Sequence, residues 1–283
     1  MATSIGSTGI TFGDSTTQNT AALLFGIEYQ TISPVDVQTF NSSGTWSKPA
    51  SGTIALIECW GGGGSGSRRS TRPYTGGGGG GYAAAYISLS KLSSSVSVTV
   101  GAGGASRSGS NLAGLPGGNT SFGNIIEVTG GEGGPLADEG GAEGGSWSLN
   151  NVRFSLSLTE SWPSLLGTTS LIIPGGTLDY TNTTVIDPLY DISIFRIEDG
   201  GHSNYFDSFA TNGGNAYRAG AGGGGTVLNV TAALLPPGTS TYGGNGGAGG
   251  TTGTAGAQPG GGGGGATSTS GAGGAGRVKV TVF

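Results

Sequence analysis

Residues 54–64 read IALIECWGGGG, an apolar strand that runs directly into four glycines. Ile54 and Leu56 lie on one face of this strand, and apolar residues also occupy the other face. Such a pattern is typical of a strand buried between two layers. Because the glycines that follow carry no side chains, they cannot extend a hydrophobic core. The stretch therefore favours a fold that uses glycine backbone as its building material.

Glycine dominates the whole chain. It accounts for 64 of 283 residues, roughly three times the usual share of a globular protein. Two dense blocks, 61–145 with 27 glycines and 213–276 with 26, flank a segment at 146–212 that has only 5. A flexible Gly/Ser linker would not be expected to have this organisation or to contain strands. The net charge of −5 is also too small for disorder driven by charge repulsion.

Strand patterns surround the glycine blocks. Residues 35–39 and 277–282 both alternate apolar with polar residues, as half-buried strands do. Since the first and last strands of the glycine-rich region match in type, we expect them to join one antiparallel sheet. That pairing would bring the two ends of the region together.

Between the strands, glycine recurs with a period of three. Residues 243–251 form three consecutive GGX triplets, GGNGGAGGT. Three is the period of the polyproline-II conformation, which makes no hydrogen bonds within its own strand, so neighbouring glycine helices would bond to one another. Collagen is excluded because glycine fills two of three positions in short bursts and prolines total only 11. We predict a mostly β fold with antiparallel, sandwich-like strands, a bundle of polyglycine-II helices and almost no α-helix.

Composition divides the chain into four parts. Residues 1–34 are too polar to fold alone and are expected to form an N-terminal attachment or connector segment. Residues 35–145 and 213–283 form the first and second parts of a glycine-rich β/polyglycine-II domain. Residues 146–212 contain strand patterns and nine aromatic residues. This segment is predicted to be a small β module inserted into the glycine scaffold.

The sequence gives little support for the common types of catalytic or metal site. His202 is the only histidine and Cys59 the only cysteine, which argues against multi-histidine metal sites, cysteine-based metal sites and a Ser-His-Asp triad. A GxGxxG match at 220–225 is expected by chance in so glycine-rich a chain. The acidic balance disfavours nucleic acid as a partner, and no apolar run is long enough to insert into a membrane. We expect no catalytic residue, no cofactor, no metal and no secretory signal.

Several motifs, in this order, resemble the glycine-rich domain of bacteriophage tail-fibre and adhesin proteins. They are TWSKPA at 45–50, ECWGGGG at 58–64, GGGGGGY at 76–82, VTVGAGG at 98–104 and GRVKV at 276–280. The resemblance covers about 37–145 and 213–283. It implies polyglycine-II bundles that strands tie together at one end, with receptor-reading loops exposed at the far end. Residues 10–18 are also similar to segments of virion structural proteins, particularly of phages that infect cyanobacteria.

The resemblance implies an external appendage of the virion, a tail fibre or tip adhesin without enzymatic activity. It would bind a host-surface glycan such as lipopolysaccharide, or an outer-membrane receptor, and residues 1–34 would contact other virion proteins. Aromatic rings can stack on sugars and arginines can bind anionic groups, so these types supply the expected receptor contacts. The expected contact residues are Trp162, Tyr180, Tyr190, Tyr205, Arg68, Arg69 and Arg72.

Three alternatives stay open. One is a purely structural virion protein, such as a capsid decoration protein or a fibre shaft. Another is a polysaccharide depolymerase, because paired carboxylates can hydrolyse a glycoside and the insert contains acids such as Asp179 and Asp191; the insert is, however, short for the repetitive solenoids of such enzymes. A third is an ice-binding protein, which would need regular rows of Thr or Ala. The oligomeric state also stays open, with a homotrimer among the possibilities.

Overall fold

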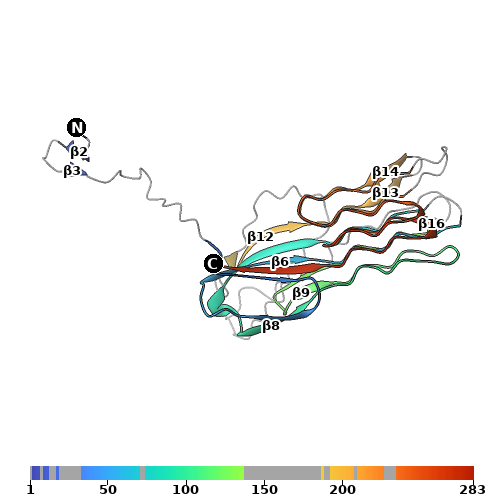
Figure 1. The fold of residues 1–283 in the computed structure, drawn as a ribbon, viewed down its shortest axis with the longest axis horizontal. Coiled ribbons are helices and arrows are strands. Elements are labelled where there is room, and N and C mark those ends of the chain that lie inside the picture. Colours follow the sequence, from blue (N-terminus) through green and yellow to red (C-terminus); the bar gives the residue numbers. More distant parts are fainter. Residues whose placement is uncertain are drawn as a thin grey trace, which may run out of the picture. The chain divides into compact units, whose positions relative to one another are not determined.

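The computed structural model describes residues 2–6, 9–12, 17–18, 33–70, 74–136, 186–187, 192–206, 209–225 and 234–283 (Figure 1). These residues form strands, turns and extended glycine runs, with one turn of 3₁₀ helix at Leu89–Lys91. The predicted mostly β fold is therefore confirmed. The chain divides into two compact units, Met1–Ser33 and Pro34–Phe283.

The first unit contains a small antiparallel sheet. Its strands are β1 (Ala2–Gly6), β2 (Gly9–Phe12) and β3 (Thr17–Gln18), in that order. Ile10 of β2 pairs with Ile5 of β1 and with Gln18 of β3. The stretch that resembles virion structural proteins, 10–18, thus forms two of the three strands.

The second unit begins with a six-stranded antiparallel sheet. Its order is β11 (Ile186–Asp187), β12 (Ile192–Glu198), β7 (Tyr82–Ser88), β6 (Ile54–Trp60), β17 (Arg277–Val282) and β4 (Asp36–Phe40). The last strand, β17, lies between β6 and β4 and pairs antiparallel with both. The prediction that the first and last strands share one sheet is confirmed.

A four-stranded antiparallel sheet packs against one face of the larger sheet. Its order is β10 (Ile126–Val128), β9 (Thr120–Phe122), β8 (Ser95–Thr99) and β5 (Gly44–Ser47). Alternate residues of both sheets form one hydrophobic core that includes Ile57, Val98 and Val280, all buried. Trp46 is fully buried there, with its ring 5.5 Å from that of Phe122 in an edge-to-face arrangement. This core supplies the ordinary hydrophobic part of the stability.

Two short pairs complete the strands of the second unit. They are the antiparallel pair β13 (Ser203–Phe206) and β14 (Phe209–Gly213), and the parallel pair β15 (Gly250–Thr252) and β16 (Ala266–Thr269). Figure 1 shows β13, β14 and β16 at the end of the glycine runs that lies away from β6 and β8. We call this end of the second unit the far end.

The glycine runs form a lattice of backbone hydrogen bonds. Successive amides of 61–69 donate in turn to the runs 75–81, 112–118 and 266–274. Each of these three runs therefore accepts a hydrogen bond from every third residue of 61–69. This rotation is the pattern that packed polyglycine-II helices would make. The polyglycine-II conformation itself stays a prediction. The hydrogen bonds establish that glycine backbone, rather than side chains, joins these runs.

The innermost runs have neighbours on every side. Carbonyl oxygens of 61–67 accept hydrogen bonds from three further runs, through Gly104, Gly131 and Gly263 among others, which makes six neighbours in all. A Cβ built on Gly63 would lie 2.5 Å from the carbonyl carbon of Gly261, a distance that no side chain can occupy. Close packing of backbone therefore requires glycine at such positions.

The GGX pattern follows from this packing. In 243–251 the third residue of each triplet is exposed, whereas the glycines face neighbouring runs. A Cβ on Gly247 would lie 2.8 Å from the carbonyl carbon of Thr254. Side chains such as Asn245 are thus confined to the outer surface of the lattice. The sequence therefore repeats with a period of three because every third residue of this run faces solvent and can carry a side chain.

Candidate functional site

Side chains that could select a ligand are concentrated where the glycine runs turn. Inside the lattice most glycines leave no room for a Cβ, and backbone groups make most of the hydrogen bonds there. At the far end, the run 61–69 reaches a loop, and the neighbouring runs turn at 107–112 and at β16. These loops are held together by hydrogen bonds and form the candidate site.

Two arginines predicted from the sequence lie in this site. The backbone of Arg68 exchanges two hydrogen bonds of 2.8 Å with Leu112, and its Nε donates to the carbonyl oxygen of Ser268 at 2.9 Å. The amide of Arg69 donates to the carbonyl oxygen of Ala266 at 2.9 Å. Both side chains are half-buried. The backbone of both residues is thus fixed on two sides by neighbouring loops.

A third arginine joins them that sequence reasoning missed. The amide of Arg107 donates to the Ser270 hydroxyl at 2.9 Å, and the amide of Ser270 donates back to the Arg107 carbonyl oxygen at 2.9 Å. Arg68 and Arg107 therefore flank the same segment, 266–270. The only available sequence signal was a polar loop, 105–111, between two glycine-containing runs. We call Arg68, Arg69 and Arg107 the far-end arginines.

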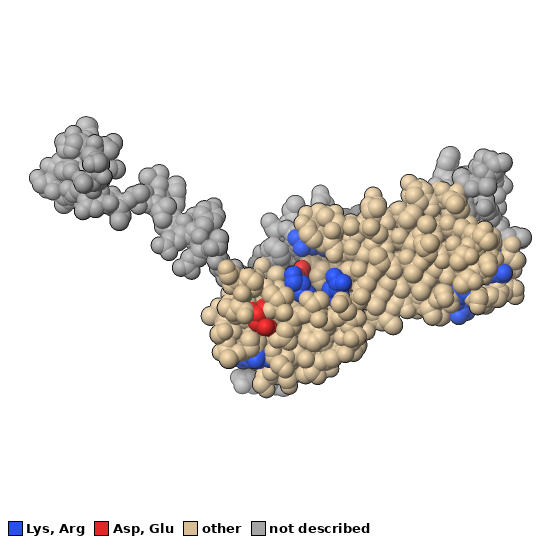
Figure 2. All heavy atoms as spheres, viewed as in Figure 1, with Lys and Arg blue, Asp and Glu red and all other residues tan. Residues whose placement is uncertain are grey.

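Arg68 and Arg107 have no ion-pair partner among the residues that the structure describes. The described ion pair is Lys279–Glu58, which lies on the large sheet. Within the same residues, Nη1 of Arg68 and Nε of Arg107 are buried without an acceptor. Figure 2 shows Lys or Arg at this end and no Asp or Glu on the face drawn. The loops can therefore attract an anionic group.

Of the other predicted contact residues, the structure describes one. Arg72, Trp162, Tyr180 and Tyr190 lie outside the described residues. Tyr205 lies in β13, where its backbone pairs with Ala210 of β14 at the far end of the lattice. The structure therefore brings the strand of Tyr205 and two predicted arginines to the same end of the second unit.

The predicted module at 146–212 is also described only in part. Its residues 192–198 form β12, which pairs with β7 inside the six-stranded sheet. Gly201 donates to Gly220 and accepts from Gly79, so the next residues belong to the glycine lattice. Residues 192–202 are therefore part of the framework, although their composition matches that of the predicted insert.

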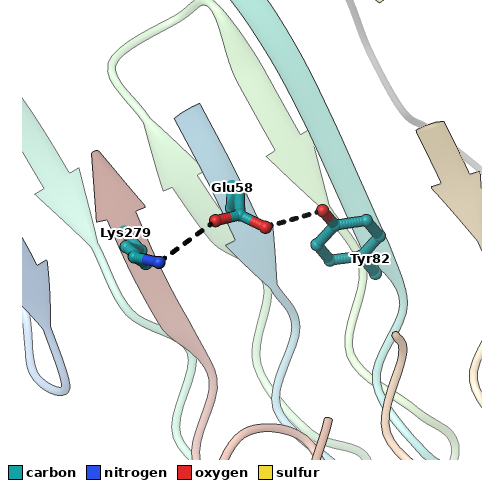
Figure 3. A network of polar contacts seen from close by, with 3 residues as sticks. All are labelled: Glu58, Tyr82 and Lys279. Atoms are coloured by element: carbon teal, nitrogen blue, oxygen red, sulfur yellow. Dashed lines mark hydrogen bonds and ion pairs between the residues drawn. The ribbon is translucent and has the colours of Figure 1, made fainter. Parts of the chain in front are cut away.

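A second polar cluster lies on the face of the large sheet that is turned away from the main hydrophobic core (Figure 3). Oε1 of Glu58 accepts a 2.9 Å hydrogen bond from the Tyr82 hydroxyl, and Oε2 lies 3.8 Å from Nζ of Lys279. Burial, and secondarily the charge of Glu58, raises the pKa of Tyr82. Burial likewise raises the pKa of the Cys59 thiol, which keeps this thiol protonated and unreactive. The cluster links three neighbouring strands and holds their register.

Comparison with known families identifies the architecture. A family model described as a glycine-rich domain matches residues 37–282, from β4 to the last residue of β17. The chain belongs to this family. The match covers both sheets, both glycine-dense blocks and the segment between them. No curated protein matches the chain.

In the part of the chain that the structure describes, no three His, Cys, Asp or Glu side chains gather in a way that could hold a metal ion. In the same residues, no helix has the length and apolar character needed to cross a membrane.

Asp199 provides a pH test of the junction between sheet and lattice. Burial, and secondarily the charge of Glu198, raises the pKa of Asp199 from 3.8 to about 6. Folding thus disfavours its ionised form, which costs stability above pH 6, and this cost disappears as the pH falls towards 4. We expect Asp199→Asn to raise the melting temperature at pH 8 and to leave it nearly unchanged at pH 4. A melting-temperature difference that is independent of pH would contradict this assignment.

Proposed function

We propose that this glycine-rich domain protein is a receptor-binding appendage of a bacteriophage virion, a tail fibre or tip adhesin. Its ligand is an anionic glycan on the host surface, of which lipopolysaccharide is the leading example. The observation that carries the proposal is the group of far-end arginines, whose backbone is held by hydrogen bonds between loops at the end of the lattice. Binding alone, without catalysis, is the proposed mechanism.

Rigid presentation favours binding by these loops. Their backbone bonds to neighbouring runs mean that little chain entropy is lost when a ligand binds. A guanidinium can form two parallel hydrogen bonds with a phosphate or carboxylate, which suits the anionic groups of surface glycans. Several copies on one virion would add avidity to weak single contacts. Trp162, Tyr180, Tyr190 and Tyr205 stay proposed as further contacts that stack on sugar rings.

A double substitution tests the arginines. Arg68→Ala together with Arg107→Ala should lower adsorption of the purified protein to host cells roughly tenfold or more, because charge-assisted hydrogen bonds are lost. The matched control is Lys48→Ala with Lys91→Ala, which removes the same charge from the sheet end and should leave adsorption unchanged. Each variant loses one described side-chain hydrogen bond, from Arg68 to Ser268 or from Lys48 to Leu92, so both should stay folded with similar, slightly lower melting temperatures. Unchanged adsorption by the arginine variant would favour the purely structural alternative.

Residues 1–34 are proposed to attach the protein to other virion components. The compact unit that they form, Met1–Ser33, is separate from the unit that contains both sheets and the lattice. Deletion of residues 1–33 should therefore leave a folded protein with an unchanged melting temperature that is no longer incorporated into particles. Normal incorporation of the shortened chain would place the attachment elsewhere.

A further inference from the structure

The second unit exposes two aromatic side chains at the junction between sheet and lattice. Tyr217 and Tyr242 are 51% and 54% exposed, whereas every other aromatic side chain that the structure describes is buried or half-buried. They belong to two turns, 216–219 and 239–243, and the amide of Tyr242 donates to the carbonyl oxygen of Tyr217 at 2.9 Å. Their ring centroids are 5.1 Å apart at 81°. Two exposed rings thus form one aromatic surface.

A cation lies against this surface. The guanidinium carbon of Arg218 is 5.0 Å from the ring centroid of Tyr242 and 5.7 Å from that of Tyr217. It is also 5.9 Å from the ring of Tyr82, which Glu58 holds in place (Figure 3). Its Nε is buried without an acceptor, and no described carboxylate forms an ion pair with Arg218. The guanidinium therefore lies beside this surface without an ion pair to a described carboxylate.

The backbone beneath the cluster is fixed independently of the two exposed rings. The Glu198 carboxylate accepts the amide hydrogens of Tyr217 and Arg218, the latter at 2.6 Å. Nε1 of Trp60 donates to the carbonyl oxygen of Arg218 at 2.7 Å. Because these contacts use backbone groups, the two tyrosine rings stay exposed, and Arg218 is half-buried beside them. Such preorganisation is a property of binding sites.

The side chains of the two turns indicate which class of ligand this surface would bind. Aliphatic side chains that are exposed elsewhere, such as Val37 and Leu115, are absent from both turns. The remaining side chains of the turns and their flanks are small or polar, including Asn215, Thr239 and Ser240. A protein interface is usually built on a larger, more apolar centre. Exposed rings beside a cation and short polar side chains suit a sugar ring that carries an acidic group.

We propose that Tyr217, Arg218 and Tyr242 form a saccharide subsite for an acidic sugar. The sugar ring stacks on an exposed tyrosine face, and its carboxylate accepts hydrogen bonds from the Arg218 guanidinium. The subsite lies where the lattice meets the large sheet, at the opposite end of the runs from the far-end arginines. It does not depend on the adhesin proposal, because its residues and its location differ from those of the far-end loops.

Titration of the isotopically labelled full chain with simple sugars tests the subsite. The probes are the methyl glycosides of galacturonic, glucuronic and sialic acids, with methyl galactoside as the neutral reference. At least one acidic sugar should shift the backbone NMR signals of residues 217, 218 and 242, and should bind roughly tenfold more tightly than the neutral sugar. Absence of shifts at these residues with all three acidic sugars would overturn the proposal.

Substitutions separate the roles of ring and charge. Tyr242→Ala should weaken binding of the acidic sugar about tenfold, whereas Tyr242→Phe, which keeps the ring, should change it little. Arg218→Gln should remove the preference for the acidic sugar over the neutral one. The Lys48→Ala/Lys91→Ala variant, which lies outside both proposed sites, is the control and should bind as the wild type does. Undiminished binding by Tyr242→Ala, or loss of binding in the lysine control, would show that the sugar binds elsewhere.

Discussion

Replacement of Gly80 by alanine is expected to lower the free energy of unfolding by about 3 kcal/mol or more, as severe overpacking does. The added Cβ would collide with the carbonyl oxygen of Gly61 and would lie 2.5 Å from its carbonyl carbon and 2.9 Å from the oxygen of Gly62. These are backbone atoms of the lattice, so they cannot rotate away as a side chain would. Relief of the clash requires that two runs move apart and lose their hydrogen bonds.

The adjacent glycine supplies a matched control. A Cβ on Gly81 would have its nearest neighbours at 3.6 Å, the oxygen of Thr129, and 3.8 Å, the oxygen of Glu198. These are ordinary van der Waals distances, so Gly81→Ala should be nearly neutral. Urea denaturation of both variants measures the difference. Equal stabilities would mean that the lattice yields easily and that close backbone packing does not hold the fold together.

Exposure does not predict the cost of such substitutions. Gly246 is half-exposed, yet a Cβ there would collide with the carbonyl oxygen of Gly222 and lie 2.6 Å from its carbon. Gly262 is fully buried, and its Cβ would lie 2.8 Å from the carbonyl carbon of Gly77. We expect Gly246→Ala to be about as destabilising as Gly262→Ala, because the distance to the neighbouring backbone, rather than burial, sets the penalty.

The strands could be predicted from the sequence because their side chains alternate. The pattern at 277–282 indicated a half-buried strand in the sheet of the first strand, and β17 occupies that place. The arrangement of the glycine runs could not be predicted in the same way. Gly63 donates to Gly274, more than two hundred residues away, through backbone groups that are the same in every run. Because the runs have no side chains that distinguish them, their sequences do not indicate which runs are neighbours.

The candidate sites were predictable only where their residues are close in sequence. Arg68 and Arg69 are adjacent and were expected to contact an anionic ligand. Tyr217 and Tyr242 lie in separate turns that the fold joins through one backbone hydrogen bond, so neither turn alone indicates a site. Composition also gave no sign of β12 in the main sheet. Residues 192–198 contain too little glycine to resemble the scaffold, yet they form β12 of its main sheet.

Hydrogen exchange should separate the inner runs of the lattice from its surface. The amides of 260–265 donate in turn to four other runs, and this run has six neighbours in all: 61–67, 75–81, 220–225, 243–250, 253–257 and 270–276. Exposure of its amides requires separation from several neighbours at once, so local opening should cost nearly as much as global unfolding. With a stability of about 5 kcal/mol or more, protection should reach roughly four orders of magnitude.

The run 243–251 provides the internal comparison. Two of the three residues in each of its triplets are glycine, and the third faces solvent. Its amides at 244, 246, 247 and 250 donate to described backbone carbonyl oxygens, whereas every amide of 260–265 does so. Its amides should therefore be protected less strongly and less uniformly than those of 260–265. Exchange measured by mass spectrometry on overlapping peptides resolves the two runs. Free exchange throughout both would mean that the glycines form a flexible linker. Stronger protection of 260–265 requires the lattice, since an all-glycine run outside a lattice would be the more flexible of the two.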